Sequence, residues 1–260
     1  MTKTFLSNAF RSFPSSFGRP KGPDPYLSDD PNVADTEVNF SDKVMLEESI
    51  RKLKVPQGTK ESPARTCKEL ALAKPNLPNG FYWIDPNNHD AEDAFEVYCD
   101  FRTRQSCVQP QNQVDKAQWY EGPQKRTWFS EEVTNGFSFT YKASKNQLRF
   151  LQLLSSRASQ NVTYHCKNSI AYYDQQSQNF NSALSLLTSN EKELGVQQPI
   201  KFRYSVSLDE CQYRQNKWTR TVFEINTEKP KRLPVIDVAP VDIGDRNQAF
   251  GLELGPVCFS

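Results

Sequence analysis

The residues of this chain best suited to chemistry form a short run rich in Asp and Asn. From position 85 it reads Asp-Pro-Asn-Asn-His-Asp-Ala-Glu-Asp, and its candidate ligands are Asp85, Asn87, Asn88, Asp90 and Asp93. A Ca²⁺ ion takes about six to eight oxygen ligands, which a tight loop of this composition can bring together. The run lacks the central Gly and the final Glu of an EF-hand loop. It is therefore compatible with a different kind of calcium site or with an Asx turn followed by a capped helix.

The sequence offers no catalytic arrangement of side chains. It has two histidines, His89 and His165, and none of the motifs of zinc proteases, serine hydrolases, phosphate-binding loops or dinucleotide-binding proteins. His165 stands next to Cys166, but adjacent residues of a strand point to opposite faces, which makes a Cys/His dyad geometrically poor. We therefore expect Cys166 to form a disulfide and the chain not to be an enzyme.

The six cysteines indicate an oxidising compartment. Their number is even, no Cys-x-x-Cys pair indicates a zinc ribbon, and the chain carries the glycosylation sequon Asn161-Val162-Thr163. Six buried free thiols are the alternative. The sequon predicts a glycan on Asn161, because its middle residue is not Pro and it precedes a strand-like run.

Charge and hydropathy exclude two classes of partner. Lys and Arg number 32 against 31 Asp and Glu, so the net charge of +1 provides no general field for nucleic acid or anionic lipid. No apolar run approaches the roughly 20 residues of a membrane span. Residues 1–5 lack the apolar core of a signal peptide, so we expect the true start of a secreted protein to lie further upstream.

The elements that must position these residues begin after a Pro-rich segment. Residues 1–35 contain five prolines among Gly, Ser and Asp, and we expect them to form a disordered linker.

A helix is expected to follow this linker. Leu46, Ile50 and Leu53 recur at helical spacing, which predicts an amphipathic helix over residues 41–55 with Ser41 as its cap. At about four turns this helix is marginal alone. It needs a partner, either the globular domain of its own chain or copies of itself in a coiled coil.

Beyond Cys67 the sequence alternates between short aromatic or β-branched runs and turn signals, a pattern typical of strands. Leu148, Leu151 and Leu154 fall on one side of a further predicted helix. The predicted fold class is therefore α+β. The predicted strands are 81–84, 95–98, 137–141, 202–206 and 221–225, and the predicted helices are 90–95, 146–159 and 181–187.

Several segments, in order along the chain, carry a family resemblance. They are residues 63–67 (PARTC), 82–87 (YWIDPN), 158–172 (ASQNVTYHCKNSIAY), 232–240 (RLPVIDVAP) and 255–259 (GPVCF). Together they closely resemble the C-terminal propeptide, a non-collagenous domain also called COLFI, of a fibrillar collagen. The similarity runs from about Asp29 to Ser260.

The resemblance implies a secreted structural protein of the extracellular matrix. In this family three procollagen chains, as a homo- or heterotrimer, are selected and aligned in the endoplasmic reticulum so that their triple helix nucleates in register. It implies a coiled-coil stalk at residues 36–57. A globular domain at residues 58–260 would contain a base and a fibrinogen-like petal. Calcium would lie at the trimer base on the five ligands given above, and Asp90 stands where the family uses the main-chain oxygen of a cysteine.

The resemblance also assigns the cysteines and a cleavage site. The implied intrachain disulfides are Cys67–Cys99, Cys107–Cys258 and Cys166–Cys211. Ala73 and Asp90 occupy the positions at which most family members carry cysteines that link neighbouring chains, so we expect no covalent trimer. Ser28-Asp29 resembles the bond that procollagen C-proteinase cuts before an Asp, and a linker would make it accessible.

Two questions stay open on the sequence alone. Ten glycines, with Gly18 and Gly22 out of triplet phase, exclude a collagen triple helix inside this chain, so either the Gly-X-Y region lies upstream or the domain works alone. The region between Tyr141 and Leu148 is shorter than in well-known family members, so partner choice is not carried over. The alternative function is a free-standing fibrinogen-related recognition module that binds carbohydrate or protein ligands.

Overall fold

The computed structural model of the chain describes residues 40–87, 91–118, 126–132 and 137–260. The chain divides into two units, residues 1–43 and 44–260, and only residues 40–43 of the first are described. The expected linker of residues 1–35 and the expected cleavage site Ser28-Asp29 lie outside the described residues. So do the candidate ligands Asn88 and Asp90.

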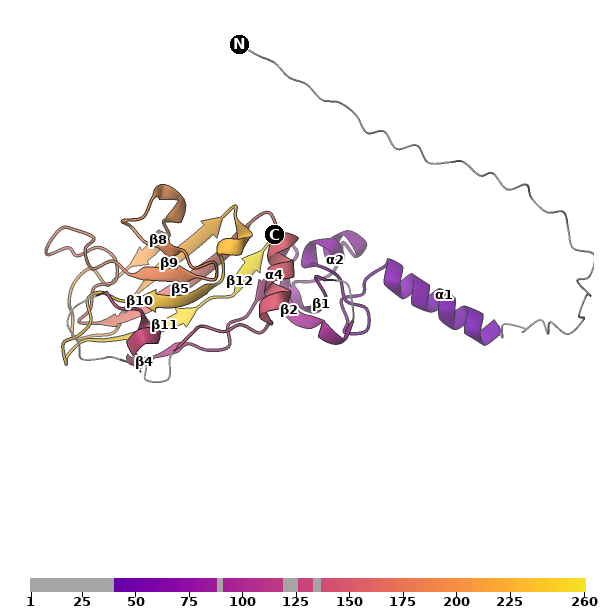
Figure 1. Ribbon diagram of the computed structural model, residues 1–260, viewed down its shortest axis with the longest axis horizontal. Coiled ribbons are helices and arrows are strands. Elements are labelled where there is room, and N and C mark those ends of the chain that lie inside the picture. Colours follow the sequence, from indigo (N-terminus) through magenta and orange to yellow (C-terminus); the bar gives the residue numbers. More distant parts are fainter. Residues whose placement is uncertain (1–39, 88–90, 119–125, 133–136) are drawn as a thin grey trace, which may run out of the picture. The chain divides into compact units, whose positions relative to one another are not determined.

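The first helix, α1 (Phe40–Lys54), agrees with the prediction to within one residue at each end (Figure 1). It begins at Phe40, so Ser41 lies inside the helix and does not cap it. Four apolar side chains of α1 are exposed to solvent in the part of the chain that the structure describes. The side chains that are 41 to 68% exposed are Val44, Met45, Leu46 and Ile50.

A nine-stranded antiparallel sheet dominates the second unit (Figure 1). Its main path runs β1-β2-β3-β12-β5-β11-β4, while β9 pairs with β5 and carries β8 on its other side. β5 is the longest strand; it pairs with β9, β11 and β12 and so lies at the centre. The strands are β1 (Gly80–Ile84), β2 (Phe95–Asp100), β3 (Gln105–Val108), β4 (Val114–Gln118), β5 (Ala158–Lys167), β8 (Ser205–Asp209), β9 (Thr219–Thr227), β11 (Ala249–Leu254) and β12 (Val257–Phe259).

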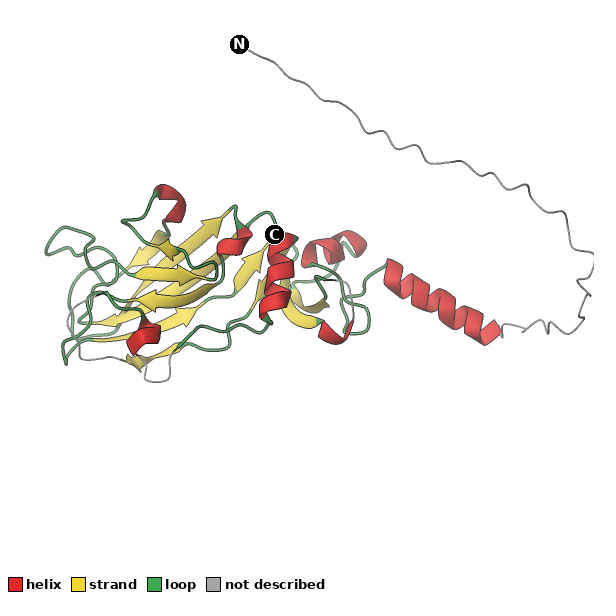
Figure 2. Cartoon of the chain, viewed as in Figure 1, coloured by secondary structure: helices red, strands yellow, loops and turns green. Residues whose placement is uncertain are grey.

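A second sheet and several short helices complete the α+β fold (Figure 2). The second sheet has the order β10-β6-β7 and is also antiparallel. Its strands are β10 (Val235–Ala239), β6 (Ser185–Thr188) and β7 (Glu193–Leu194). The helices are α2 (Cys67–Ala73), α3 (Phe129–Glu132) and α4 (Lys145–Leu153), and the 3₁₀ turns are η1 (Ala91–Asp93), η2 (Ile200–Phe202) and η3 (Pro230–Arg232).

Aromatic side chains from the central strands fill the core. Tyr164 of β5 and Phe250 of β11 are buried and stack with their ring centroids 5.6 Å apart. Phe129 of α3 packs edge-on against Phe250, also at 5.6 Å. In β9 the residues at alternate positions from Thr221 to Thr227 are buried, as expected for a strand with one face on the core. This packing holds the sheet and its covering helices together.

The predicted helix at 146–159 is correct only as far as Leu153. The backbone N–H groups of Ser156 and Arg157 donate to the carbonyl oxygen of Ser260 at 2.7 and 3.0 Å, which draws the chain out of the helix. From Ala158 the chain continues as β5, because β9, β11 and β12 offer it hydrogen-bond partners. The predicted helix at 181–187 is wrong, because 185–188 is β6, paired with β10 and β7. An apolar run of this length fits either element until its partners are known.

Three further predictions need correction. The run 137–141 is not a strand; only Tyr141 forms an isolated bridge, with Pro110, and the rings of Phe137 and Phe139 pack edge-on instead. The run 202–206 begins in η2, and its strand starts only at Ser205. The expected helix 90–95 is reduced to the single turn η1, because β2 begins at Phe95 to pair with β1. The strands predicted at 81–84, 95–98 and 221–225 are confirmed.

Candidate functional site

The candidate metal loop starts where β1 ends. Asp85 follows Ile84 directly, and its backbone N–H donates to the carbonyl oxygen of Ala64 at 2.7 Å. Ala64 also forms a parallel bridge with Ile84, so this segment holds the start of the loop from a second side. Asp85 is only 5% exposed. A carboxylate is therefore fixed at the buried end of the loop.

The far end of the loop is tied to its beginning by Asn87. Its Nδ2 donates to Oδ2 of Asp93 at 2.9 Å. The amide oxygen of Asn87 is buried and accepts no hydrogen bond from any described residue. Buried acceptor oxygens are normally satisfied, so this one needs a donor or a cation from elsewhere. Amide and carboxylate oxygens are the donors that a hard cation such as Ca²⁺ prefers, so the residue types of this loop fit that ion.

The structure places three of the five expected ligands and connects two of them. Asn87 and Asp93 are in contact, Asp85 lies two residues before Asn87, and Asn88 and Asp90 lie outside the described residues. Among the residues that are described, no group of three or more His, Cys, Asp or Glu side chains could hold a metal ion. The calcium site therefore stays a proposal.

Gln147 is a residue of this site that the prediction missed. Ser144 caps α4 in a capping box: its side chain accepts from the N–H of Gln147, and Gln147 Oε1 accepts from the N–H of Ser144 at 2.7 Å. The side-chain amide nitrogen of Gln147, Nε2, donates to the main-chain oxygen of Asp93. The helix cap thus also anchors the loop. The Ser-x-x-Gln spacing is a sequence signal that could have located this cap.

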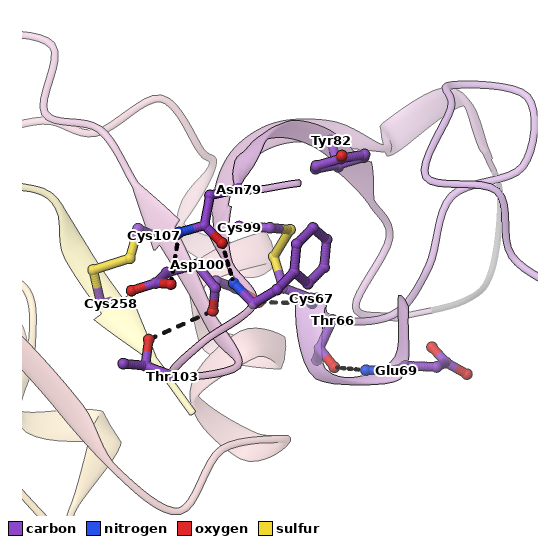
Figure 3. The surroundings of a disulfide bond; sticks show 12 residues. Thr66, Cys67, Glu69, Asn79, Tyr82, Cys99, Asp100, Thr103, Cys107 and Cys258 are labelled. Atoms are coloured by element: carbon purple, nitrogen blue, oxygen red, sulfur yellow. Dashed lines mark hydrogen bonds between the residues drawn. A yellow bond between two sulfur atoms is a disulfide. The ribbon is translucent and has the colours of Figure 1, made fainter. Parts of the chain in front are cut away.

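The six cysteines form the three disulfides that the resemblance implies, and none of them is free. Cys67–Cys99 joins the start of α2 to β2 (Figure 3). Thr66 caps α2, because its hydroxyl accepts from the N–H of Glu69 at 3.2 Å. The buried N–H of Cys67 donates to Ser106 of β3. The disulfide and this hydrogen bond therefore fix α2 against β2 and β3.

The other two disulfides span longer loops. Cys107–Cys258 links β3 to β12 over a separation of 151 residues, with the two Cα atoms 4.0 Å apart (Figure 3). Cys166–Cys211 links β5 to the segment after β8 over 45 residues. Because each bridge joins segments that are distant in the chain, both restrict the unfolded state strongly.

His165 has no catalytic partner among the described residues. Its neighbour Cys166 is in a disulfide, and its Nε2 lies 3.4 Å from Oε2 of Glu253 on the adjacent strand. Burial lowers the pKa of His165, which the hydrogen bond with Glu253 opposes. A nearby carboxylate without a nucleophile forms no catalytic dyad.

The sequon lies on the central strand. Asn161 of β5 is exposed, whereas Val162 is fully buried, in agreement with the alternation of a strand. The side chain of Asn161 is therefore accessible from solvent at this position. This geometry is compatible with the predicted glycan.

Comparison with known proteins identifies relatives over most of the chain. A family model described as the fibrillar collagen C-terminal domain matches residues 34–259. Collagen alpha-2(I) chains are 41% identical over 250 residues in Oncorhynchus mykiss, 43% over 236 in Oryctolagus cuniculus and 43% over 239 in Rattus norvegicus. These alignments cover 92, 86 and 86% of this chain, but only 18, 44 and 17% of the relatives. The chain thus spans less than half the length of each relative.

Within the described ranges, no helix is long and apolar enough to cross a membrane.

Proposed function

Because the chain belongs to the family of fibrillar collagen C-terminal domains, we propose that it assembles with two further procollagen chains and aligns them for triple-helix formation. The family is one of structural proteins of the extracellular matrix and not of enzymes. We propose that the whole chain acts as a secreted assembly domain, as a homo- or heterotrimer.

The exposed apolar side of α1 carries this proposal. Leu46 and Ile50 are 61 and 41% exposed in a helix of fifteen residues, too short to be stable in water without a partner. Copies of α1 from three chains would cover these side chains in a coiled coil. We therefore assign residues 36–57 to a stalk and residues 58–260 to a globular domain whose petal is fibrinogen-like.

Calcium is the cofactor that we propose for the candidate loop. Asp85, Asn87 and Asp93 would contribute oxygens, with Asn88 and Asp90 completing the set. The unsatisfied amide oxygen of Asn87 supports this assignment. The ion would compensate the carboxylates and cross-link the loop, so assembly would depend on calcium. Since all six cysteines are used within the chain, no interchain disulfide would hold the trimer.

After assembly, we propose that procollagen C-proteinase cuts the chain at Ser28-Asp29.

Light scattering of the secreted chain tests the proposal. In calcium we expect a mass of three times 29.9 kDa. In excess chelator the trimer should be weaker, so it should dissociate at a higher protein concentration than it does in calcium. On a denaturing gel without reductant the protein should run as a single chain. A monomer that is indifferent to calcium would contradict the trimerisation proposal.

Substitutions in α1 separate assembly from folding. The double variant Leu46→Asp/Ile50→Asp should be monomeric, because it places charges in the proposed seam while leaving the globular domain and its disulfides unchanged. Glu48→Lys is the matched control, since position 48 lies on the opposite side of the helix from both residues and its variant should remain a trimer.

A shallow, open hollow on the surface is the observation that favours the alternative function. It has a volume of about 410 Å³ and is lined by Tyr172, Tyr173 and Phe180 and by residues of β8 that include Asp209. A free-standing recognition module would bind carbohydrate or protein ligands there. It would need no trimer, so the light-scattering experiment also distinguishes the two functions.

Glycosylation of Asn161 is a further expected result. When the chain is secreted from mammalian cells, peptide N-glycosidase should reduce its mass, and Asn161→Gln should abolish that change. Folding should not depend on the glycan, because the side chain of Asn161 is exposed. A wild-type sample whose mass does not change on treatment would disprove occupancy.

A further inference from the structure

A cluster of cationic side chains gathers where η2 and η3 meet. We refer to Lys201, Arg203, Lys229, Lys231 and Arg232 as the basic patch. The two turns are joined directly, because Nη1 of Arg232 donates to the carbonyl oxygen of Lys201 at 2.7 Å. Lys201, Lys229 and Lys231 are all exposed. Residues about 30 positions apart in the sequence thus present their charges on one surface.

One aromatic ring organises the centre of the basic patch. Nζ of Lys201 lies 5.2 Å and the guanidinium carbon of Arg232 lies 4.7 Å from the centroid of the Phe202 ring. Both distances are within the range of cation–π contacts, which hold cations in place without neutralising them. The charges therefore remain available to an external ligand.

The backbone of η3 fixes the spacing of its lysines. The N–H of Arg232 donates to the carbonyl oxygen of Lys229 at 2.9 Å, and the N–H of Lys229 donates to Thr227 Oγ1 at 3.1 Å. Pro230 stands between the two lysines and restricts the turn further. Lys229 and Lys231 are thus presented from a preorganised turn, which lowers the entropy lost on binding.

The basic patch has little acidic compensation. Among the described residues, no acidic side chain forms an ion pair with Lys201, Lys229 or Lys231. The nearest acid in sequence, Glu228, lies 3.4 Å from Arg157 instead. Since the whole chain has a net charge of only +1, this is a local concentration of positive charge and not a property of the whole surface.

We propose that the basic patch binds the sulfate groups of a sulfated polysaccharide. An unpaired cluster of lysines and arginines on a fixed turn is complementary to a polymer of regularly spaced anions. The disulfides place the chain in an oxidising compartment, where such polysaccharides and not nucleic acids are the available polyanions. Binding at this patch does not depend on the proposed trimerisation, although three patches in one trimer would strengthen it by avidity.

Heparin is the probe for this proposal, used with the full chain. We expect heparin to bind with an affinity that falls steeply as salt rises, and chemically desulfated heparin not to bind. The triple variant Lys201→Gln/Lys229→Gln/Lys231→Gln should weaken binding at least about tenfold, since each cation contributes separately to attraction by an anionic surface. Arg232 stays unchanged in this variant because its hydrogen bond supports the fold.

A matched variant controls for net charge. Lys68→Gln/Lys116→Gln/Lys217→Gln removes the same charge from exposed lysines outside the basic patch and should keep nearly full affinity. Equal losses in both variants would overturn the proposal, because binding would then follow net charge. No binding of heparin by the wild-type chain would also overturn it.

Anionic vesicles test the competing ligand. Ile200 is 83% exposed next to Lys201, and insertion into a bilayer would require this apolar side chain, whereas sulfate binding would not. Ile200→Asn should therefore leave heparin binding unchanged. A wild-type chain that binds vesicles but not heparin would assign the basic patch to a membrane surface and contradict our proposal.

Discussion

The double variant Cys107→Ser/Cys258→Ala is expected to lower the free energy of unfolding by about 5 kcal/mol. The disulfide closes a loop over 151 residues, the longest of the three, so its removal returns the most conformational freedom to the unfolded chain. Cys107 is also only 4% exposed, so the change is made inside the packed sheet. Urea denaturation of the oxidised protein, followed by circular dichroism, measures the effect.

The matched control for this variant is Cys166→Ser/Cys211→Ala. That bridge closes a loop over 45 residues, for which the same relation gives about 4 kcal/mol. The expected order of the two costs is therefore fixed by loop length. A larger loss from the shorter loop would show that native-state packing, and not the unfolded chain, determines the contribution of these bridges.

Gln160→Ala is expected to lower the free energy of unfolding by about 3 kcal/mol, because it leaves buried polar groups without partners. Gln160 of β5 is 2% exposed. Its Nε2 donates to the hydroxyl of Tyr141 at 2.7 Å and to the carbonyl oxygen of Gly255 at 3.1 Å, while its Oε1 accepts from the N–H of Val235 at 2.9 Å. One side chain thus connects four separate segments of the domain.

Gln152→Ala provides the comparison for this loss. Gln152 on α4 is half-buried and donates from Nε2 to the carbonyl oxygen of Leu233 at 2.7 Å. Its removal should cost about 1 kcal/mol, since the acceptor loses only one partner. Thermal or urea unfolding of both variants gives the ratio. Equal losses would mean that the network around Gln160 contributes no more than an ordinary hydrogen bond.

Local patterns in the sequence were sufficient to predict the elements with strong periodicity. The repeat of Leu46, Ile50 and Leu53 located α1, and the aromatic and β-branched runs located β1, β2 and β9. The oxygen-rich run after β1 located the candidate loop in the same way. In each case the residues that carry the signal lie within one element or loop, so their neighbours in the fold did not need to be known.

Long-range pairing explains what was missed. Residues 158 and 159, where β5 begins, were predicted as the end of a helix because the helical pattern of α4 continues into them without a strong breaker. Only the strand partners show where β5 starts. β12 has three residues, too few for any periodicity. In the sequence, nothing distinguishes Gln160 from an ordinary polar residue of a strand. Its partners Tyr141 and Val235 lie 19 and 75 positions away, so its buried hydrogen bonds could not be predicted. The basic patch likewise forms only when η2 and η3 meet.

The position of β12 in the sheet sets an order of events during synthesis. Of the strands in the described part of the chain, β12 is the last to be translated, yet it lies between β3 and β5 and connects the β1-β2-β3 part of the sheet to the rest. Until it emerges, Cys107 has no Cys258 to oxidise with, and β3 lacks a neighbour on one side. A message that ends prematurely before Val257 therefore yields a product with a divided sheet and an unpaired thiol. Such a product is chemically distinct from the finished chain, because it carries a thiol where the finished chain has a disulfide.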